Sequence, residues 1–103
     1  LSIFRMDNFK EIANKTLNAI FDMIEKNYAH LDVDFEQENL RIEKDDKVFI
    51  LSVHNPSLQI WLSSPLSGAH HFEFASDENN WTGTRDRKLQ LTEMLKNELD
   101  SLK

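Results

Sequence analysis

The sequence predicts an α+β fold, a two-layer α/β sandwich whose antiparallel sheet of five to six strands carries N- and C-terminal helices on one face. Apolar residues recur at helical spacing near both ends of the chain and alternate with polar residues at strand spacing between them. Short turn segments separate the alternating stretches, which favours antiparallel neighbours. A chain of 103 residues with 40% hydrophobic content fits one domain, residues 1–103.

Two segments have the apolar periodicity of amphipathic helices. The first covers residues 8–27, and Asp7 is its candidate N-cap because a carboxylate can accept from the free N–H groups of a first turn. The second begins at about Leu89. The apolar positions are Phe9, Ile12, Ala13, Leu17, Ile20, Phe21 and Ile24 in the first segment, and Leu91, Met94, Leu95, Leu99 and Leu102 in the second. Such helices can cover one sheet face and leave the other wet.

Six segments between the helices have strand character. They are residues 31–36, 40–43, 47–54, 58–62, 70–74 and 81–83, separated by polar turns and by Pro56 and Pro65. Alternation within them assigns faces, since successive strand side chains point to opposite sides of a sheet.

Composition and charge exclude several function classes. The chain has no cysteine, so it cannot hold an iron–sulfur cluster or a structural zinc by thiolates, or use a cysteine nucleophile. Its net charge of −6 disfavours nucleic acid and anionic membranes as partners. No apolar run is long enough to span a bilayer. Cations and basic protein surfaces are the partners that this charge favours.

Carboxylates gather on one predicted edge of the domain. Glu11, Asp22 and Glu25 share the polar face of the first helix, and the residues Asp32, Asp34 and Glu36 share one face of the first strand. Oxygen ligands suit hard cations, and iron is compatible with carboxylate and water. The alternative is a solvated charged face that protects an edge strand from aggregation.

Trp61 is the second candidate feature. If Ile60 and Leu62 point toward the core, Trp61 and Gln59 point outward, and an outward indole indicates a partner surface. In the reversed register Trp61 would be a core residue. His70 and His71 point to opposite faces and cannot chelate one metal together. No catalytic serine motif, phosphate loop or paired-histidine metal motif is present, so we assign no catalytic residue.

The central block resembles a frataxin. Residues 55–68 read NPSLQIWLSSPLSG, close to the family signature N-P-x-x-Q-I-W-L-S-S-P-x-S-G, and the resemblance continues through residues 71–74, 80–81 and 91–95. It implies a helix–sheet–helix sandwich. It also implies weak binding of Fe²⁺ and Fe³⁺ by Asp22, Glu25, Asp32, Asp34 and Glu36, with Glu11 as a further candidate.

The resemblance also implies partners. A frataxin is expected to contact the cysteine desulfurase and the scaffold protein of iron–sulfur cluster assembly and to change how fast sulfur reaches the scaffold. The acidic edge would meet basic desulfurase residues. The sheet face would meet the scaffold through Gln59, Trp61 and His71, together with Ser52, which stands where many members carry asparagine.

Two rival functions remain open from the sequence. One is a ferroxidase with iron storage, although no ExxH pair of a di-iron bundle is visible. The other is an acidic interaction module without a metal role. We expect a monomer. The form Ser63-Ser64-Pro65 is similar to mitochondrial and α-proteobacterial members, which implies the mitochondrial matrix or a related organelle, with the bacterial cytoplasm as the alternative.

Overall fold

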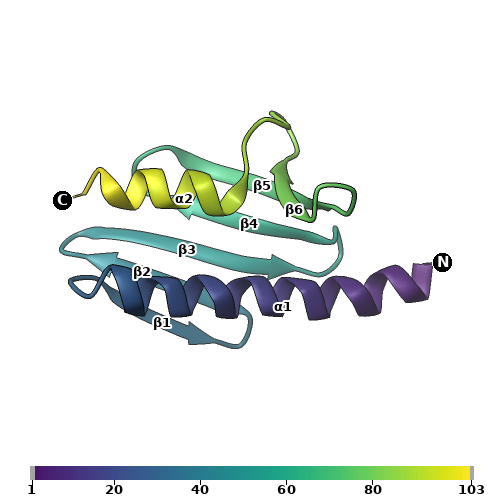
Figure 1. Cartoon of the computed structure of the whole chain (residues 1–103), viewed down its shortest axis with the longest axis horizontal. Coiled ribbons are helices and arrows are strands. Elements are labelled where there is room, and N and C mark those ends of the chain that lie inside the picture. The colour runs from purple at the N-terminus through teal and green to yellow at the C-terminus, as the bar shows by residue number, and fades with distance from the viewer. Residues whose placement is uncertain (1, 103) are drawn as a thin grey trace.

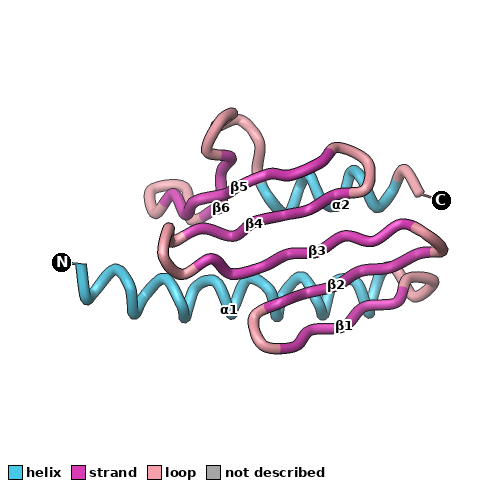
Figure 2. The backbone as a smooth tube through the Cα atoms, turned by 180° about the vertical axis from the view of Figure 1, so that it is seen from behind, coloured by secondary structure: helices cyan, strands magenta, loops and turns pink. Residues whose placement is uncertain are grey.

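The computed structural model describes residues 2–102, with the side chains of the first helix from Asn8 onward. Helix α1 (Ser2–Asn27) is followed by six strands and by helix α2 (Leu91–Asp100). The strands are β1 (Asp32–Glu36), β2 (Asn39–Lys44), β3 (Lys47–His54), β4 (Gln59–Ser64), β5 (Gly68–Ala75) and β6 (Asn80–Gly83). They form one antiparallel sheet in chain order. Both helices lie on the same face of this sheet, which confirms the predicted α+β sandwich (Figures 1 and 2).

Helix α1 is longer than its sequence pattern predicted. Its backbone is helical from Ser2, six residues before the predicted start at Asn8, so Asp7 lies inside the helix and not at its N-cap. The side chain of Asp7 lies outside the described residues. The prediction was wrong because Asp7 can occupy an interior helical position as well as an N-cap, and the apolar residues Ile3 and Met6 continue the helical spacing toward the N-terminus. No helix in residues 2–102 is long and apolar enough to cross a membrane.

The strand boundaries differ from the predicted ones where the backbone has positive φ. Leu58 has φ 57°, which ends the turn after β3, and β4 therefore begins at Gln59. Gly68 has φ 91° and opens β5 two residues earlier than predicted; glycine fits because it has no Cβ to clash there. The β1–β2 hairpin turns through Gln37 and Glu38, both with positive φ, as a two-residue hairpin loop requires.

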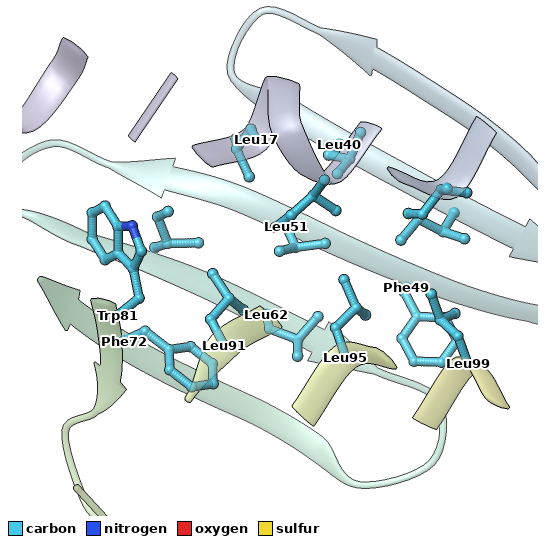
Figure 3. Packing of buried hydrophobic residues seen from close by; sticks show 14 of the residues in the cluster. Leu17, Leu40, Phe49, Leu51, Leu62, Phe72, Trp81, Leu91, Leu95 and Leu99 are labelled. Atoms are coloured by element: carbon cyan, nitrogen blue, oxygen red, sulfur yellow. The ribbon is translucent and has the colours of Figure 1, made fainter. Parts of the chain in front are cut away.

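The core lies between the helices and the inner face of the sheet (Figure 3). Residues three or four positions apart on α1 and α2 are buried against every second residue of β2 to β5, as the helical period of 3.6 and the strand period of two require. Burying one such aliphatic side chain is worth about 1.5–3 kcal/mol. The buried set includes Ala13, Leu17, Ile24, Leu91, Leu95 and Leu99 from the helices, and Leu40, Ile42, Phe49, Leu51, Ile60, Leu62 and Phe72 from the sheet.

Trp81 connects β6, the last strand, to α1 through side-chain contacts. Its side chain is 3% exposed, and its indole Nε1 donates a 2.8 Å hydrogen bond to Thr16 Oγ1 of α1. Its ring meets Phe9 and Phe74 edge to face, with centroids 5.9 and 5.3 Å away. Trp81 is therefore a structural residue, unlike Trp61, which lies on the opposite face of the sheet.

The two helices run in the same direction and are tied at their C-terminal ends (Figure 1). The hydroxyl of Tyr28, one residue beyond α1, donates a 2.7 Å hydrogen bond to Asp100 Oδ1 at the end of α2. This hydrogen bond, followed by burial and by the Asp100 charge, raises the pKa of Tyr28 to about 12. The contact bridges 72 residues of sequence, so it joins the first and last elements directly.

Candidate functional site

The open face of the sheet carries a tryptophan, as the strand alternation predicted. Ile60 and Leu62 are 0% and 1% exposed beneath the helices, whereas Trp61 between them is only half-buried and points away from the core. The register pairs Trp61 with Ser52 on β3 and with His71 on β5. The reversed register, in which Trp61 would be a core residue, is therefore excluded.

Two imidazoles flank the indole of Trp61. His54 stacks on one side with ring centroids 3.9 Å apart and planes 13° apart, and His71 stacks on the other at 4.3 Å and 11°. The indole Nε1 donates a 2.7 Å hydrogen bond to Gln59 Oε1, which fixes the rotation of the ring. Both faces of the indole are thus covered within the chain, and its exposed part is the outward rim.

The four predicted partner-binding residues lie together on this face. Ser52, Gln59, Trp61 and His71 occupy facing or adjacent positions on β3, β4 and β5. Ser52 Oγ donates a 2.8 Å hydrogen bond to Asn39 Oδ1, so this serine is tied to β2 and not to the stack.

His54 is the residue of this face that sequence reasoning missed. It lies two positions after Ser52 on β3, so the same alternation that assigned Ser52 outward assigns His54 outward too. Its Nδ1 lies 2.6 Å from Ser57 Oγ in the following turn, which orients the ring against Trp61. The turn geometry, not visible in the alternation, brings the two rings into contact.

The predicted acidic residues lie on two sides of one sheet edge. β1 is the edge strand, and Asp32, Asp34 and Glu36 are exposed on the open face, opposite the core-facing Val33 and Phe35. Helix α1 packs beside β1 on the other face. The carboxylates of strand and helix therefore border the same edge from different layers (Figure 2).

On α1 the exposed acids are Glu11, Asp22 and Glu25. Asp22 and Glu25 are one helical turn apart, which brings their Cβ atoms within about 5–6 Å. Glu11 precedes Asp22 by eleven residues, about 16 Å along a helix, so it cannot share an ion with that pair. Among the described side chains, from residue 8 to residue 102, no three His, Asp or Glu come together closely enough to hold a metal ion. The acids form an extended string, not a chelating cluster.

One positively charged side chain, that of Arg41, lies on the strand next to the carboxylates of β1. Arg41 on β2 lies directly opposite Asp34 in the register and forms a 2.7 Å ion pair with Glu43. The side chain of Arg41 is 50% exposed and that of Glu43 is 35% exposed, so solvent screens this pair and it contributes little to stability. The guanidinium of Arg41 offsets part of the negative charge at the middle of β1.

The Ser-rich turn after β4 has a structural role. Ser64 and Ser67 each donate a 2.6 Å hydrogen bond to a different oxygen of Glu98 on α2, and the N–H groups of Leu66 and Ser67 donate to Ser64 Oγ. His70 Nε2 lies 2.8 Å from Ser67 Oγ. In this chain of contacts the serine lies between acid and histidine, whereas a nucleophilic triad places the histidine in the middle. The turn therefore anchors the β4–β5 hairpin to α2.

Comparisons with known proteins agree with this arrangement. Residues 2–102 match the family model of the frataxin-like domain. The chain is 30% identical over 107 residues to the mitochondrial frataxin of Arabidopsis thaliana, covering 98% of this chain and 57% of that protein. It is 30% identical over 84 residues to the mitochondrial frataxin homologue of Schizosaccharomyces pombe, covering 76% and 53% respectively. The chain spans about half the length of these curated relatives.

Solved structures share the fold. The frataxin of Psychromonas ingrahamii superposes with a TM-score of 0.83 at 21% identity, over 94% of this chain and 90% of that one. A trimeric frataxin of Saccharomyces cerevisiae, described as complexed with ferrous iron, superposes with a TM-score of 0.78 at 25% identity, over 87% and 83%. The family model, which matches nearly the whole length, and the curated relatives together show that this chain belongs to the frataxin family.

Proposed function

We propose that this protein is an iron-binding accessory factor of iron–sulfur cluster assembly that docks on the cysteine desulfurase–scaffold complex and changes the rate of sulfur transfer. The observation that carries the proposal is Trp61 standing on the open sheet face between His54 and His71. An aromatic residue held rigidly on a face that no helix covers has the properties of a binding hot spot.

The open face is suited to a protein partner. Trp61 is immobilised by two ring contacts and a hydrogen bond to Gln59, so docking on it would order few new rotamers. Ile50, 38% exposed on β3, adds apolar surface to the same face. Polar side chains, including Ser52, surround this apolar centre. An apolar centre with a polar rim is typical of a transient protein–protein interface, and we propose that the scaffold protein binds this face.

The acidic edge carries iron as loosely held cargo. The Asp22–Glu25 turn offers two carboxylates, and the strand residues Asp32, Asp34 and Glu36 offer a second row. Carboxylates exposed to water and spread along an edge bind a hard cation weakly and exchange it readily. The same negative edge would speed the encounter with a basic surface of the desulfurase in a salt-dependent way.

A sulfide-production assay on a reconstituted desulfurase–scaffold complex tests the function. The rate is measured with and without this protein, and each condition is repeated with Fe²⁺ under anaerobic conditions. We expect this protein to change the rate and to co-migrate with the complex in size-exclusion chromatography. An unchanged rate in every condition, with no co-migration, would overturn the proposed function.

A ferroxidase role is less well supported by the geometry. Efficient oxidation by a di-iron site needs bridging carboxylates and histidines held a few ångströms apart. The helix and strand acids of residues 2–102 instead form a string in which no three ligands converge. Repeated oxygen-consuming turnover on excess Fe²⁺ would favour the enzyme over the accessory factor.

We further propose the mitochondrial matrix as the location, because the two curated relatives described above are both mitochondrial frataxins. The protein is proposed to act as a monomer, although a trimeric yeast frataxin has the same fold. Light scattering with and without Fe²⁺ distinguishes the two assembly states.

A further inference from the structure

A hollow of the described surface lies at the edge of the sheet opposite β1, and of its lining residues the function proposed above uses only His71. It has a volume of about 550 Å³ and lies between β5 and the segment 84–89. Strand β6 pairs only with residues 72–75 of β5, so the first half of β5 has no strand on that side. The hollow is lined by Ser67, Ala69, His70, His71, Thr84 and Arg85, among others. We propose that it binds a small oxyanion that carries phosphate or carboxylate groups.

The walls of this hollow are fixed by the backbone. The N–H of Thr84 donates to the carbonyl oxygen of His71 at 2.9 Å, and Gly83 and Leu89 are joined by a 3.0 Å bond from the N–H of Gly83. The loop passes so close to β6 that a Cβ on Gly83 would lie 2.7 Å from the carbonyl oxygen of Asp86, which only glycine avoids. A site held in this way needs little reordering when a ligand arrives.

The loop beside the hollow is basic, whereas the chain as a whole is acidic; of its charged residues, Arg85 and Asp86 line the hollow. Residues 84–88 contain two arginines, one lysine and one aspartate, a net charge of +2 in a chain of −6. Arg87 is held by Glu73 in a 2.7 Å ion pair. Arg85 is exposed and, among the described residues, has no ion pair or hydrogen bond. A free guanidinium favours oxyanions, which it can bind with two parallel hydrogen bonds.

Two acids near the hollow, Asp86 and Glu98, accept hydrogen bonds from other groups of the chain. Asp86 Oδ1 accepts from the backbone N–H of Lys88 at 3.0 Å. Glu98 lies behind Ser67, and its two oxygens accept from Ser64 and Ser67. Because the single hydroxyl proton of Ser67 goes to Glu98, the Nε2 of His70 must donate to Ser67 Oγ. Neither of these carboxylates forms an ion pair with Arg85.

Further donors face the same space. Thr84, whose side chain carries a hydroxyl group, is one of the lining residues. In an antiparallel ladder the N–H and C=O of one residue point to the same side, and this side alternates along the strand. Since His71 is bonded toward Thr84, Ala69 two residues earlier directs its own N–H toward the hollow. The backbone N–H of Ala69 on β5 and the residues Thr84 and Arg85 thus border the hollow from two segments.

Titration of ¹⁵N-labelled full chain by NMR tests this site. Sodium phosphate and sodium citrate are added separately at pH 7, and sodium chloride at matched ionic strength is the control. We expect saturable shifts confined to the amides of Ala69, His71, Thr84 and Arg85. Tighter binding of phosphate identifies phosphate-bearing ligands, and tighter binding of citrate identifies carboxylates. Absence of localised shifts with both anions would overturn the proposal.

Arg85→Gln and Lys26→Gln form a matched pair for the same titration. Each removes one positive charge from an exposed side chain, but Lys26 is near the end of α1, beside the opposite sheet edge (Figure 2). Arg85→Gln should weaken anion binding about tenfold, because a charge-assisted hydrogen bond is lost. Lys26→Gln should change it less than about twofold, since salt screens distant charges. Equal weakening by the two variants would indicate a general charge effect and no site.

Discussion

The imidazole of His71 lies almost parallel to the indole of Trp61, with ring centroids 4.3 Å apart and planes 11° apart. The two residues are direct cross-strand partners on β5 and β4, a pairing that brings Cβ atoms about 5 Å apart. His54 covers the other side of the same indole. The sheet register therefore holds an upright aromatic ring on a face that no helix covers, and the first prediction depends on that ring.

Replacing Trp61 with alanine should weaken docking on the desulfurase–scaffold complex by at least about tenfold, the loss expected when a hot-spot aromatic is truncated. The fold should survive, because Trp61 lies outside the core cluster. Binding is measured by biolayer interferometry on the immobilised complex, and folding by circular dichroism. Leu66→Ala is the control, since Leu66 is 43% exposed in the β4–β5 turn, away from the stack. Undiminished affinity of the folded Trp61→Ala protein would remove the sheet face from the proposed interface.

The double variant His54→Ala/His71→Ala should expose Trp61 without unfolding the chain. Each stacked pair contributes about 0.5–1.5 kcal/mol, so the free energy of unfolding should fall by at most about 3 kcal/mol. Acrylamide quenching of tryptophan fluorescence should increase, because both faces of the indole become accessible to the quencher. Trp81 adds little to the change, since it is 3% exposed. Identical quenching curves for the variant and the parent would show that the stack does not shield the ring in solution.

Strand alternation was sufficient to place Trp61 on the face opposite Ile60 and Leu62, because the period of two is set by the backbone itself, but it left open which of the two faces meets the core; in the structure Ile60 and Leu62 are buried. It did not predict the stacking of His54, since ring contact depends on side-chain rotamers and on the turn that holds Ser57.

The predicted start of α1 was wrong because Asp7 was assigned as the N-cap, although the apolar residues Ile3 and Met6 continue the helical spacing before Phe9. The acids were assigned to the correct elements, but the distances between the helix acids and the strand acids depend on how the helix layer packs on the sheet. Sequence spacing alone therefore cannot show whether Asp32, Asp34 and Glu36 form a cluster with Asp22 or an extended string beside it.

Iron should broaden two separate groups of amide signals in NMR spectra. One group surrounds Asp22 and Glu25 on α1, and the other surrounds Asp32 and Asp34 on β1, because these pairs lie on different sides of the edge. Asp22→Asn/Glu25→Gln should abolish broadening on the helix and leave that on the strand.

The control for this experiment is Asp45→Asn/Asp46→Asn, which removes two exposed acids from the β2–β3 turn without touching either group. Both broadened groups should persist in this variant. Simultaneous loss of both groups in the helix variant would instead indicate one shared binding site that spans the edge.

Adjacent serines at the end of β4 should differ in their effect on stability. Ser64 is 7% exposed and hydrogen-bonded to Glu98 and to two backbone N–H groups, whereas Ser63 is exposed. Ser64→Ala should lower the free energy of unfolding by about 1–3 kcal/mol, because it removes three partly buried hydrogen bonds. Ser63→Ala should change it by less than about 0.5 kcal/mol. Urea denaturation of the two variants measures the difference, and equal midpoints would show that the Glu98 contacts do not stabilise the hairpin.

Stability at alkaline pH should depend on Tyr28. Its pKa is raised from 10.0 to about 12 in the folded protein, chiefly by its hydrogen bond to Asp100. Below pH 10 the folded and unfolded chains both hold this proton, and the hydrogen bond contributes fully. Between pH 10 and about 12 the unfolded chain releases the proton first, so the free energy of unfolding decreases as the pH rises.

Tyr28→Phe removes both the hydroxyl group and its titration, which separates this group from the rest of the chain. The variant should be less stable than the parent at pH 8 by about 1 kcal/mol, the usual net contribution of one hydrogen bond. The difference should shrink as the pH rises from 10 toward 12, because the parent alone loses this contribution. Urea midpoints at pH 8, 9, 10 and 11 measure it for both proteins. A difference that stays constant across this range would show that the Tyr28–Asp100 contact does not hold the proton, and that another interaction ties the two helix ends together.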